Sequence, residues 1–529
     1  MEKRALIAVV LSLGFFYLYS MLFPAPEKKE AQKPVQQALS AAGRATALQA
    51  VPQLVNPPSG NVALKARDVK VDTDLYTAVF SSQGAALKSL VLKKYRETAG
   101  AKGNPVYLVS ETNPVGFSLR TESPALGLGT DAVFSVSADS VSVAGRDSKR
   151  LEFVWTSPQG VLVRKSYTFT GDSYAMNLHL EIVNGGPSPL AGTASLVIPH
   201  PAQPRIKESR LEVNSAVTMA DGTFSSVAVK DIPDKPRDFS ARVDWTGYAD
   251  KYFLGAVMSS ENSIASAGIR KGAGDYVVTT VLSPVFNLQP GQTGSYAYRV
   301  FFGPKELDLL KAQGQGLENA LDLGWFSAIA KPLLYTLKFF YKYTHNYGIA
   351  IIIITVIIKI LFFPLTHKSY KSMKEMQKLQ PMMTELKEKY KNDRDAMNRA
   401  MMELYRTHKV NPLGGCLPMV VQIPVFFALY KALMFSIELR HAPFLFWITD
   451  LSAKDPYYVT PIIMGATMFI QQKMTPTSMD PVQAKMMLAL PIVFTFMFLN
   501  FPSGLVIYWL VNNILTITQQ AYINHALKS

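Results

Sequence analysis

Cysteine is almost missing from this chain of 529 residues, which contains only Cys416. A single cysteine excludes an intramolecular disulfide and any metal site built from a cysteine cluster. Any domain that faces an oxidising compartment must therefore be stabilised by packing alone.

The sequence also lacks the short motifs of common enzyme classes. It contains no G-x-x-x-x-G-K-[ST] phosphate loop, no H-E-x-x-H zinc motif and no G-x-S-x-G nucleophile elbow. Histidines are few, and His179 lies within a pattern typical of a strand, so structural roles are favoured for His179 and His200. These observations predict a protein that is not an enzyme and that needs no cofactor or metal.

Apolar residues and positive charge are abundant instead. Hydrophobic residues make up 48% of the chain, and 54 Lys and Arg against 39 Asp and Glu give a net charge of +15. Such a charge can indicate nucleic-acid binding, but in a membrane protein it collects in cytoplasmic segments. The basic segments here lie between apolar stretches, so we expect a membrane protein without direct nucleic-acid specificity.

The chain begins with a short basic segment and a long apolar run. The apolar run is longer than the core of a usual signal peptide, and no A-x-A site follows it, which favours an uncleaved signal anchor over residues 1–23. Residues 24–60 are rich in Pro, Ala, Gln and Lys, as in a flexible linker.

Residues 61–320 contain no spanning segment, and their apolar residues alternate. Two alternating runs on either side of Gly171-Asp172 predict a hairpin, with the apolar positions at Val161, Val163, Tyr167, Phe169, Tyr174, Met176, Leu178 and Leu180. The same pattern occurs at Val69, Val71, Leu75, Thr77, Val79, Tyr296, Tyr298, Val300 and Phe302. We therefore expect a large antiparallel β-sandwich outside the membrane.

From residue 321 the apolar period becomes helical. We expect an interfacial amphipathic helix over residues 321–346. Its predicted apolar face carries Trp325, Ile329, Leu333, Leu337 and Phe340, and Lys331, Lys338 and Lys342 point away from that face.

Residues 347–365 form an apolar run that is long enough to cross a bilayer and contains one charge, Lys359. A lysine at a helix centre costs roughly 2.5 to 3.5 kcal/mol on insertion scales, which the surrounding Ile, Leu and Phe offset. An intramembrane charge usually marks a functional site, although Lys359 has the alternative of extending its ammonium toward cytoplasmic head groups.

The next segment, residues 366–411, is polar and basic, and its composition predicts a helical hairpin. The turn is expected near residue 392, with Asp393 as the N-cap of the second arm. Methionines such as Met376, Met383 and Met401 suggest either an adaptable contact surface or simple packing of the two arms. The basic hairpin is also a possible contact for a ribosome or anionic lipid.

Further apolar stretches over residues 416–435, 457–471, 486–500 and 505–521 bring the predicted number of transmembrane helices to six. Polar residues recur inside them, at Gln422, Thr467, Gln471, Tyr508, Asn512, Asn513 and Thr516. Thr355 lies one turn from Lys359. These residues must face the protein interior or a wet cavity, and hydrogen bonding between helices is the alternative for Gln422 and Asn513.

Several long motifs resemble one family. IIIIT at residues 351–355, NPLGGCLPMVVQIPVFFALYKAL at 411–433, LRHAPFLFWITDLSAKDPYY at 439–458 and FPSGLVIYW at 501–509 are similar to the YidC/Oxa/Alb membrane protein insertases. The preceding anchor, linker and β-domain resemble the Gram-negative YidC form, whose periplasmic domain is a β-supersandwich.

The resemblance implies a five-helix core over residues 347–529 around a hydrophilic, positively charged groove that is open to the cytoplasm and to lipid. Its site residues would be Lys359, Thr355, Gln471, Tyr508, Trp509 and Asn512. Most bacterial members of the family resemble each other in having arginine where this chain has Lys359. Lysine keeps the positive charge but lacks the planar, bidentate guanidinium of arginine.

The resemblance also implies an insertase and folding chaperone in the bacterial inner membrane, with both termini cytoplasmic. Its partners would be nascent membrane proteins, the lipid bilayer, the Sec translocon and a ribosome. Two alternatives stay open from the residues. A secondary transporter or channel would need inverted repeats and intramembrane acidic residues, and an anchored periplasmic sugar-binding protein would not need five further spans.

Overall fold

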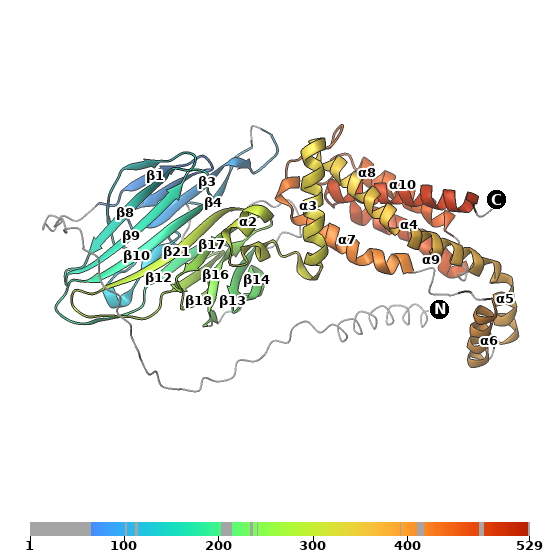
Figure 1. The fold of residues 1–529 in the computed structure, drawn as a ribbon, viewed down its shortest axis with the longest axis horizontal. Coiled ribbons are helices and arrows are strands. Elements are labelled where there is room, and N and C mark those ends of the chain that lie inside the picture. The colour runs from blue at the N-terminus through green and yellow to red at the C-terminus, as the bar shows by residue number, and fades with distance from the viewer. Residues whose placement is uncertain are drawn as a thin grey trace. The chain divides into compact units, whose positions relative to one another are not determined.

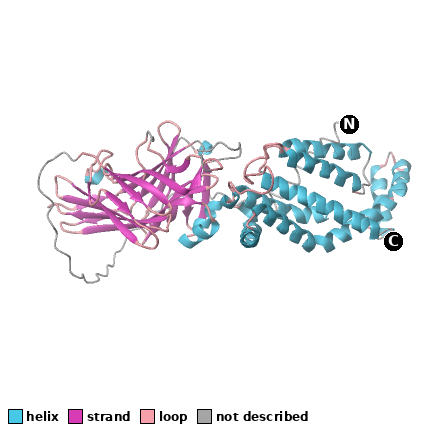
Figure 2. Cartoon of the chain, turned by 90° about the horizontal axis from the view of Figure 1, so that it is seen from above, coloured by secondary structure: helices cyan, strands magenta, loops and turns pink. Residues whose placement is uncertain are grey.

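The computed structural model describes residues 65–100, 103–111, 115–202, 214–232, 236–240, 242–391, 393–408, 410, 417–475 and 481–526, and for residues 394, 417–419, 481–486 and 526 it describes only the backbone. The predicted signal anchor, the predicted linker and Cys416 lie outside these residues. The described chain consists first of strands and then of helices (Figures 1 and 2).

The described strands form a large β-sheet domain. Its 9-stranded sheet has the order β14 (Thr223–Ala228), β13 (Ser215–Ala220), β16 (Val243–Ala249), β17 (Phe253–Ser260), β21 (Thr293–Pro304), β10 (Ala175–Asn184), β9 (Val161–Thr170), β8 (Ser148–Thr156) and β6 (Ser135–Val136). One 5-stranded sheet has the order β4 (Pro105–Val109), β3 (Ala86–Arg96), β2 (Tyr76–Ser81), β1 (Asp68–Asp72) and β7 (Ser140–Ser142).

A second 5-stranded sheet contains β15 (Arg237–Phe239), β18 (Ser266–Lys271), β19 (Tyr276–Leu282), β12 (Ser195–Pro201) and β5 (Arg120–Glu122), and β11 (Leu190–Gly192) pairs with β20 (Phe286–Leu288). The paired strands run antiparallel except β1 and β7, which are parallel. Aromatic side chains join the layers, because the Phe80 ring on β2 lies 4.6 Å from the Tyr167 ring on β9. Most of the buried residues of the sheets belong to one large core, and a smaller separate cluster contains Ala216, Val227, Ile232, Ile269 and Val277.

The predicted hairpin is confirmed by β9 and β10. Met176 pairs with Phe169 and Leu178 pairs with Tyr167 across the two strands. Tyr296, Tyr298, Val300 and Phe302 on β21 are also buried as predicted.

The predicted alternation is wrong on β2. Val69 and Val71 are buried on β1, but Thr77 and Val79 are only half-buried, and the buried side of β2 carries Tyr76, Ala78 and Phe80. The hydroxyl oxygen of Thr73 accepts hydrogen bonds from the backbone N–H groups of Leu75 and Tyr76. This turn separates the two strands, so the parity of one does not continue into the other.

The helical part contains α2 (Leu307–Gln313), α3 (Ser327–Thr344), α4 (Tyr347–Lys378), α5 (Gln380–Lys389), α6 (Arg394–Thr407), α7 (Leu417–Phe435), α8 (Val459–Met474), α9 (Pro481–Phe498) and α10 (Ser503–Ala526). Among the described helices, α4 is the one that is long and apolar enough to span a membrane by itself. Shorter apolar segments cover Val420–Phe435 and Met487–Phe498.

The predicted face of the amphipathic helix is partly wrong. Leu337 is buried, but Trp325 is 57% exposed, and Ala330 and Leu334 complete the buried face instead. The helix α3 begins only at Ser327, after the short 3₁₀ turns Leu317–Leu321 and Gly324–Phe326. Because a 3₁₀ turn has about 3.0 residues instead of 3.6, the face extrapolated from residue 321 is out of phase.

Lys338 was predicted to point away from the apolar face into solvent, but its side chain is mostly covered and paired with carboxylates. Its ammonium Nζ lies 2.9 Å from Glu306 Oε1, 2.7 Å from Asp308 Oδ2 and 3.0 Å from Glu438 Oε1. We call these four residues the Lys338 cluster. It joins α3 to the start of α2 and to the segment that follows α7.

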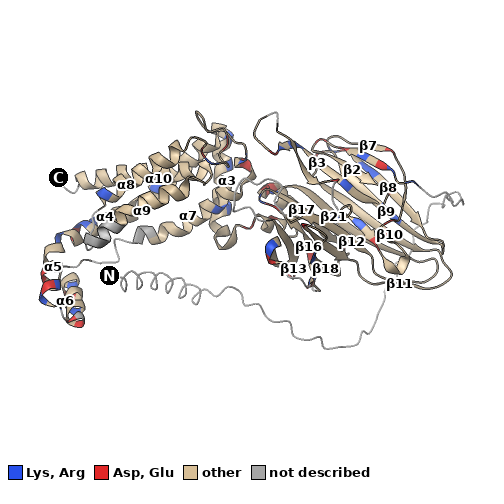
Figure 3. Ribbon diagram, turned by 180° about the vertical axis from the view of Figure 1, so that it is seen from behind, with Lys and Arg blue, Asp and Glu red and all other residues tan. Residues whose placement is uncertain are grey.

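The basic hairpin is present, but its first arm is not a separate element. Helix α4 continues through Pro364 to Lys378, and only then does α5 begin. Asp393 caps α6 as predicted, because its side chain accepts hydrogen bonds from the N–H groups of Asp395 and Ala396. Leu379, Met383 and Val410 are buried between the arms, with Met376 and Met401 against them, which favours packing of the two arms over an open methionine surface. Charged residues gather on α5 and α6, as Figure 3 shows.

Candidate functional site

Lys359 lies on α4 and reaches across to α10. Its Nζ donates a hydrogen bond to Thr516 Oγ1 at 2.7 Å, and the lysine is half-buried. An ammonium that extended toward head groups would follow the axis of its own helix toward the bilayer surface. The hydrogen bond to Thr516 instead joins the ammonium to a neighbouring helix.

Thr516 continues this contact into a chain of hydrogen bonds. Its hydroxyl donates to the backbone oxygen of Asn512 at 2.6 Å, and the Asn512 side-chain oxygen accepts from Gln422 Nε2 at 3.0 Å. We call Lys359, Thr516, Asn512 and Gln422 the polar network. It links α4, α10 and α7, and it brings together two of the predicted site residues, Lys359 and Asn512.

Tyr508 and Trp509 lie one turn away from the polar network along α10. Tyr508 is 2% exposed, whereas Trp509 is half-buried. The Trp509 ring packs edge-on against Phe426 of α7, with centroids 4.7 Å apart, and 5.2 Å from the Phe498 ring of α9. Both predicted residues thus belong to an aromatic layer beside the polar network.

Thr355 and Gln471 are not joined to the polar network by hydrogen bonds between described side chains. Thr355 is 1% exposed, and its hydroxyl donates to the backbone oxygen of Ile351 at 2.7 Å, within its own helix. Gln471 is half-buried on α8. Their roles in a groove stay predictions.

Hydrogen bonding between helices accounts for the other two polar residues that were in question. Gln422 bonds to Asn512, and Asn513 Nδ2 donates to Thr467 Oγ1 of α8 at 3.3 Å. The Gln520 amide also donates to the backbone oxygen of Met474, at the end of α8. The polar residues of α10 thus tie this helix to α7 and α8, in addition to α4.

Gln519 and Gln520 were missed in the sequence reasoning, although both are buried on α10. They follow Asn512 and Asn513 by seven positions, which is the spacing of two helical turns. The repeat of two adjacent amide residues at this spacing could have predicted that Gln519 and Gln520 lie on the same face as Asn512 and Asn513.

Two aspartates organise the segment between α7 and α8. The buried Asp455 accepts hydrogen bonds from the N–H and hydroxyl of Thr460 at 2.8 and 2.7 Å and from Trp447 Nε1 at 2.9 Å. Burial would raise the pKa of Asp455, but these hydrogen bonds outweigh it and leave the pKa below its usual value. Asp450 accepts in the same way from the N–H groups of His441 and Ser452. These hydrogen bonds order the segment and connect it to the first turn of α8.

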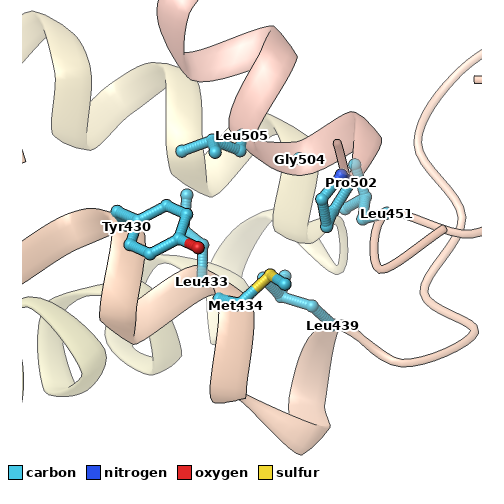
Figure 4. Close-up of a pocket in the computed structure, with 8 residues that line it drawn as sticks. All are labelled: Tyr430, Leu433, Met434, Leu439, Leu451, Pro502, Gly504 and Leu505. Atoms are coloured by element: carbon cyan, nitrogen blue, oxygen red, sulfur yellow. The ribbon is translucent and has the colours of Figure 1, made fainter. Parts of the chain in front are cut away.

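An apolar pocket lies apart from the polar network. Its lining comes from α7, the start of α10 and the segment between α7 and α8, and consists of Tyr430, Leu433, Met434, Leu439, Leu451, Pro502, Gly504 and Leu505 (Figure 4). None of these residues is a predicted site residue. The pocket offers an apolar surface with one phenol group and no charge.

Comparisons with known proteins show the family of the chain. Residues 68–336 match the family model described as the YidC periplasmic domain, and residues 339–529 match the 60Kd inner membrane protein model. The chain is 59% identical to the membrane protein insertase YidC of Geotalea uraniireducens (strain Rf4), over 100% of both chains. This chain belongs to the YidC membrane protein insertase family.

Other YidC proteins match over a similar length. The chain is 58% identical to that of Geobacter sulfurreducens (strain ATCC 51573 / DSM 12127 / PCA), over 100% of this chain and 99% of the relative. Among solved structures, an active YidC insertase with its first transmembrane domain resolved matches at 18% identity and a TM-score of 0.36, covering 84% of this chain and 90% of that chain.

Proposed function

We propose that this chain, a membrane protein insertase and not an enzyme, receives the polar parts of its clients at the polar network. The observation that carries the proposal is the hydrogen bond from Lys359 to Thr516, which holds a positive charge among apolar segments that contain no Asp or Glu. A charge at such a position lowers the stability of the inserted helix. Because it has this cost, its presence indicates a functional role.

The physical task of the site follows from the cost of polar groups in hydrocarbon. Each unpaired polar group there costs several kcal/mol. A hydrated groove with a cation lowers that cost for a polar or acidic client segment. The apolar helix of the client then enters lipid, and its transfer free energy drives insertion without a chemical fuel.

The membrane arrangement is part of the same proposal. Six transmembrane helices would comprise the anchor over residues 1–23 and five core helices within residues 347–529, and residues 321–346 would lie at the interface. Residues 61–320 would form the periplasmic domain, as an antiparallel sandwich of the supersandwich type, and residues 24–60 would connect it to the anchor. The layered sheets and the family match to a periplasmic domain support this arrangement.

The partners of this inner-membrane protein follow from its family. Insertases act on membrane-protein clients, and we propose cooperation with the Sec translocon on some of them. The basic hairpin α5–α6 would face the cytoplasm, where it could meet anionic lipid or a ribosome. Both termini would then be cytoplasmic.

Photo-crosslinking tests the client path. A photoreactive amino acid at Asn512, in the polar network, or at Trp509, beside it, should crosslink a stalled nascent client during insertion, since both positions are half-buried. The matched control is Ile514, which is 46% exposed on the other side of α10. Equal crosslinking at Ile514 and Asn512 would contradict a defined path along the network.

A further inference from the structure

The hydroxyl of Thr516 is oriented by its own helix. A threonine hydroxyl has one hydrogen to donate and two lone pairs that accept. In Thr516 the hydrogen is donated to the backbone oxygen of Asn512, four residues earlier, at 2.6 Å. The lone pairs therefore remain for the Lys359 ammonium, which donates to them at 2.7 Å.

The position of this hydroxyl is fixed as well. Thr516 is 7% exposed, so its side chain has little freedom. Asn512, which accepts the bond from the Thr516 hydroxyl, is in turn tied to Gln422 of α7 by a 3.0 Å hydrogen bond. The acceptor offered to Lys359 thus belongs to a connection between three helices.

A lysine needs such an acceptor more than an arginine does. Its ammonium is a compact charge on a flexible four-carbon stem, whereas a guanidinium can reach two acceptors with a rigid fork. The membrane segments of this chain supply no carboxylate to hold it. Without Thr516 the ammonium would be free to turn toward head groups.

We propose that Thr516 is a positioning residue that keeps the Lys359 ammonium directed across the helix interface during client insertion. This inference rests on the proposed function of Lys359. It assigns to Thr516 no client contact of its own.

The test compares two threonines of the same helix. Thr518 makes the same type of bond within α10, to the backbone oxygen of Ile514 at 2.9 Å, but it is exposed. Full-length protein in liposomes is assayed for the insertion rate of a single-span client with an acidic translocated segment. Thr516→Val should lower the rate by roughly tenfold or more, as expected for one hydrogen bond to a charge, while Thr518→Val and the conservative Thr516→Ser keep it.

A double-mutant cycle separates positioning from a purely structural role. Thr516→Val should cause no further loss in a Lys359→Met background, because the group it positions is gone. A loss that persists in that background, or a normal rate with Thr516→Val alone, would overturn the inference. A normal rate with Lys359→Met would instead overturn the proposed function. If Thr516→Val does not accumulate in membranes, Thr516→Ala replaces it in the same comparison.

Discussion

Lys305 is a buried cation at the end of the β-sheet domain. It follows β21 directly and is only 4% exposed. Burial lowers the pKa of Lys305 to about 8, although Asp250 and Asp322 oppose the shift. The charged form is therefore costly in the folded protein, and this cost has a measurable dependence on pH.

The contribution of Lys305 to stability rises with pH as the folded protein releases this proton first. Below pH 8 Lys305 is protonated in both states, so its burial lowers the free energy of unfolding. Between pH 8 and about 10.4 the unfolded chain binds more protons, so this contribution to stability rises with pH, on the order of 3 kcal/mol in total. Unfolding of the purified protein across this range should show a rise that Lys305→Met removes. Lys311→Met, an exposed lysine on α2, is the control and should keep it.

Lys359 could be predicted as a site residue from the sequence, but its hydrogen-bond partner could not. Lys359 could be identified from the sequence, because a lone charge in an apolar run is visible without a structure. Its partner could not be chosen, since Thr355, one turn away on the same helix, was as plausible as Thr516 on a helix far along the chain. The structure shows that Thr355 bonds to its own backbone and Thr516 holds the lysine.

At the scale of elements, α3 is held by the Lys338 cluster as well as by its apolar face. The side chain of Lys338 is 18% exposed, and that of Glu438 is 13% exposed. Although burial lowers the pKa of Lys338, the hydrogen bonds and charges of Asp308, Glu438 and Glu306 outweigh it and raise the pKa above its usual value. The lysine therefore stays charged at any physiological pH.

Removal of this lysine should destabilise the protein. Lys338→Met leaves three carboxylates close together without their cation, and we expect a loss of about 2 kcal/mol, less than for a fully buried pair because Asp308 stays half exposed. Lys342→Met, one turn further along α3 and exposed, is the control and should have little effect. Thermal unfolding in detergent measures both. Equal melting temperatures for the two variants would show that the cluster contributes nothing.

Elements were predicted well where a local signal defines them. The β9–β10 hairpin and the Asp393 cap follow from a turn and a capping residue. The face of α3 and the parity of β2 were wrong because each depends on a preceding turn that changes the phase. The Lys338 cluster joins residues from three separate segments of the chain, and no local sequence pattern predicts that they are in contact.

At the scale of the whole molecule, the β-sheet domain and the helical part share contacts. The Arg440 guanidinium, in the segment between α7 and α8, donates to the backbone oxygen of Glu97 at 3.0 Å and lies 5.6 Å from the Tyr252 ring. Ala428 and Ala432 of α7 belong to the apolar core that extends into the β-sheet domain. The β-sheet domain is therefore joined to α7 and to the segment after it by direct contacts as well as by the connecting chain.

Removal of the β-sheet domain up to the end of β21 should therefore lower stability but leave insertion. The polar network lies entirely on α4, α7 and α10, and the deletion keeps the Lys338 cluster. Protease protection of a client in cells that depend on the truncated protein measures insertion. Loss of insertion with a normal protein level would instead give the domain a direct part in insertion.

The central claim is that a positive charge at position 359 serves insertion. Complementation in cells depleted of their own insertase tests it most directly, with Lys359→Arg beside Lys359→Glu at equal protein levels. We expect growth with Lys359→Arg, which keeps the charge, and impaired growth and client insertion with Lys359→Glu, which would repel acidic client segments. Full activity of Lys359→Glu would contradict the electrostatic role of this site.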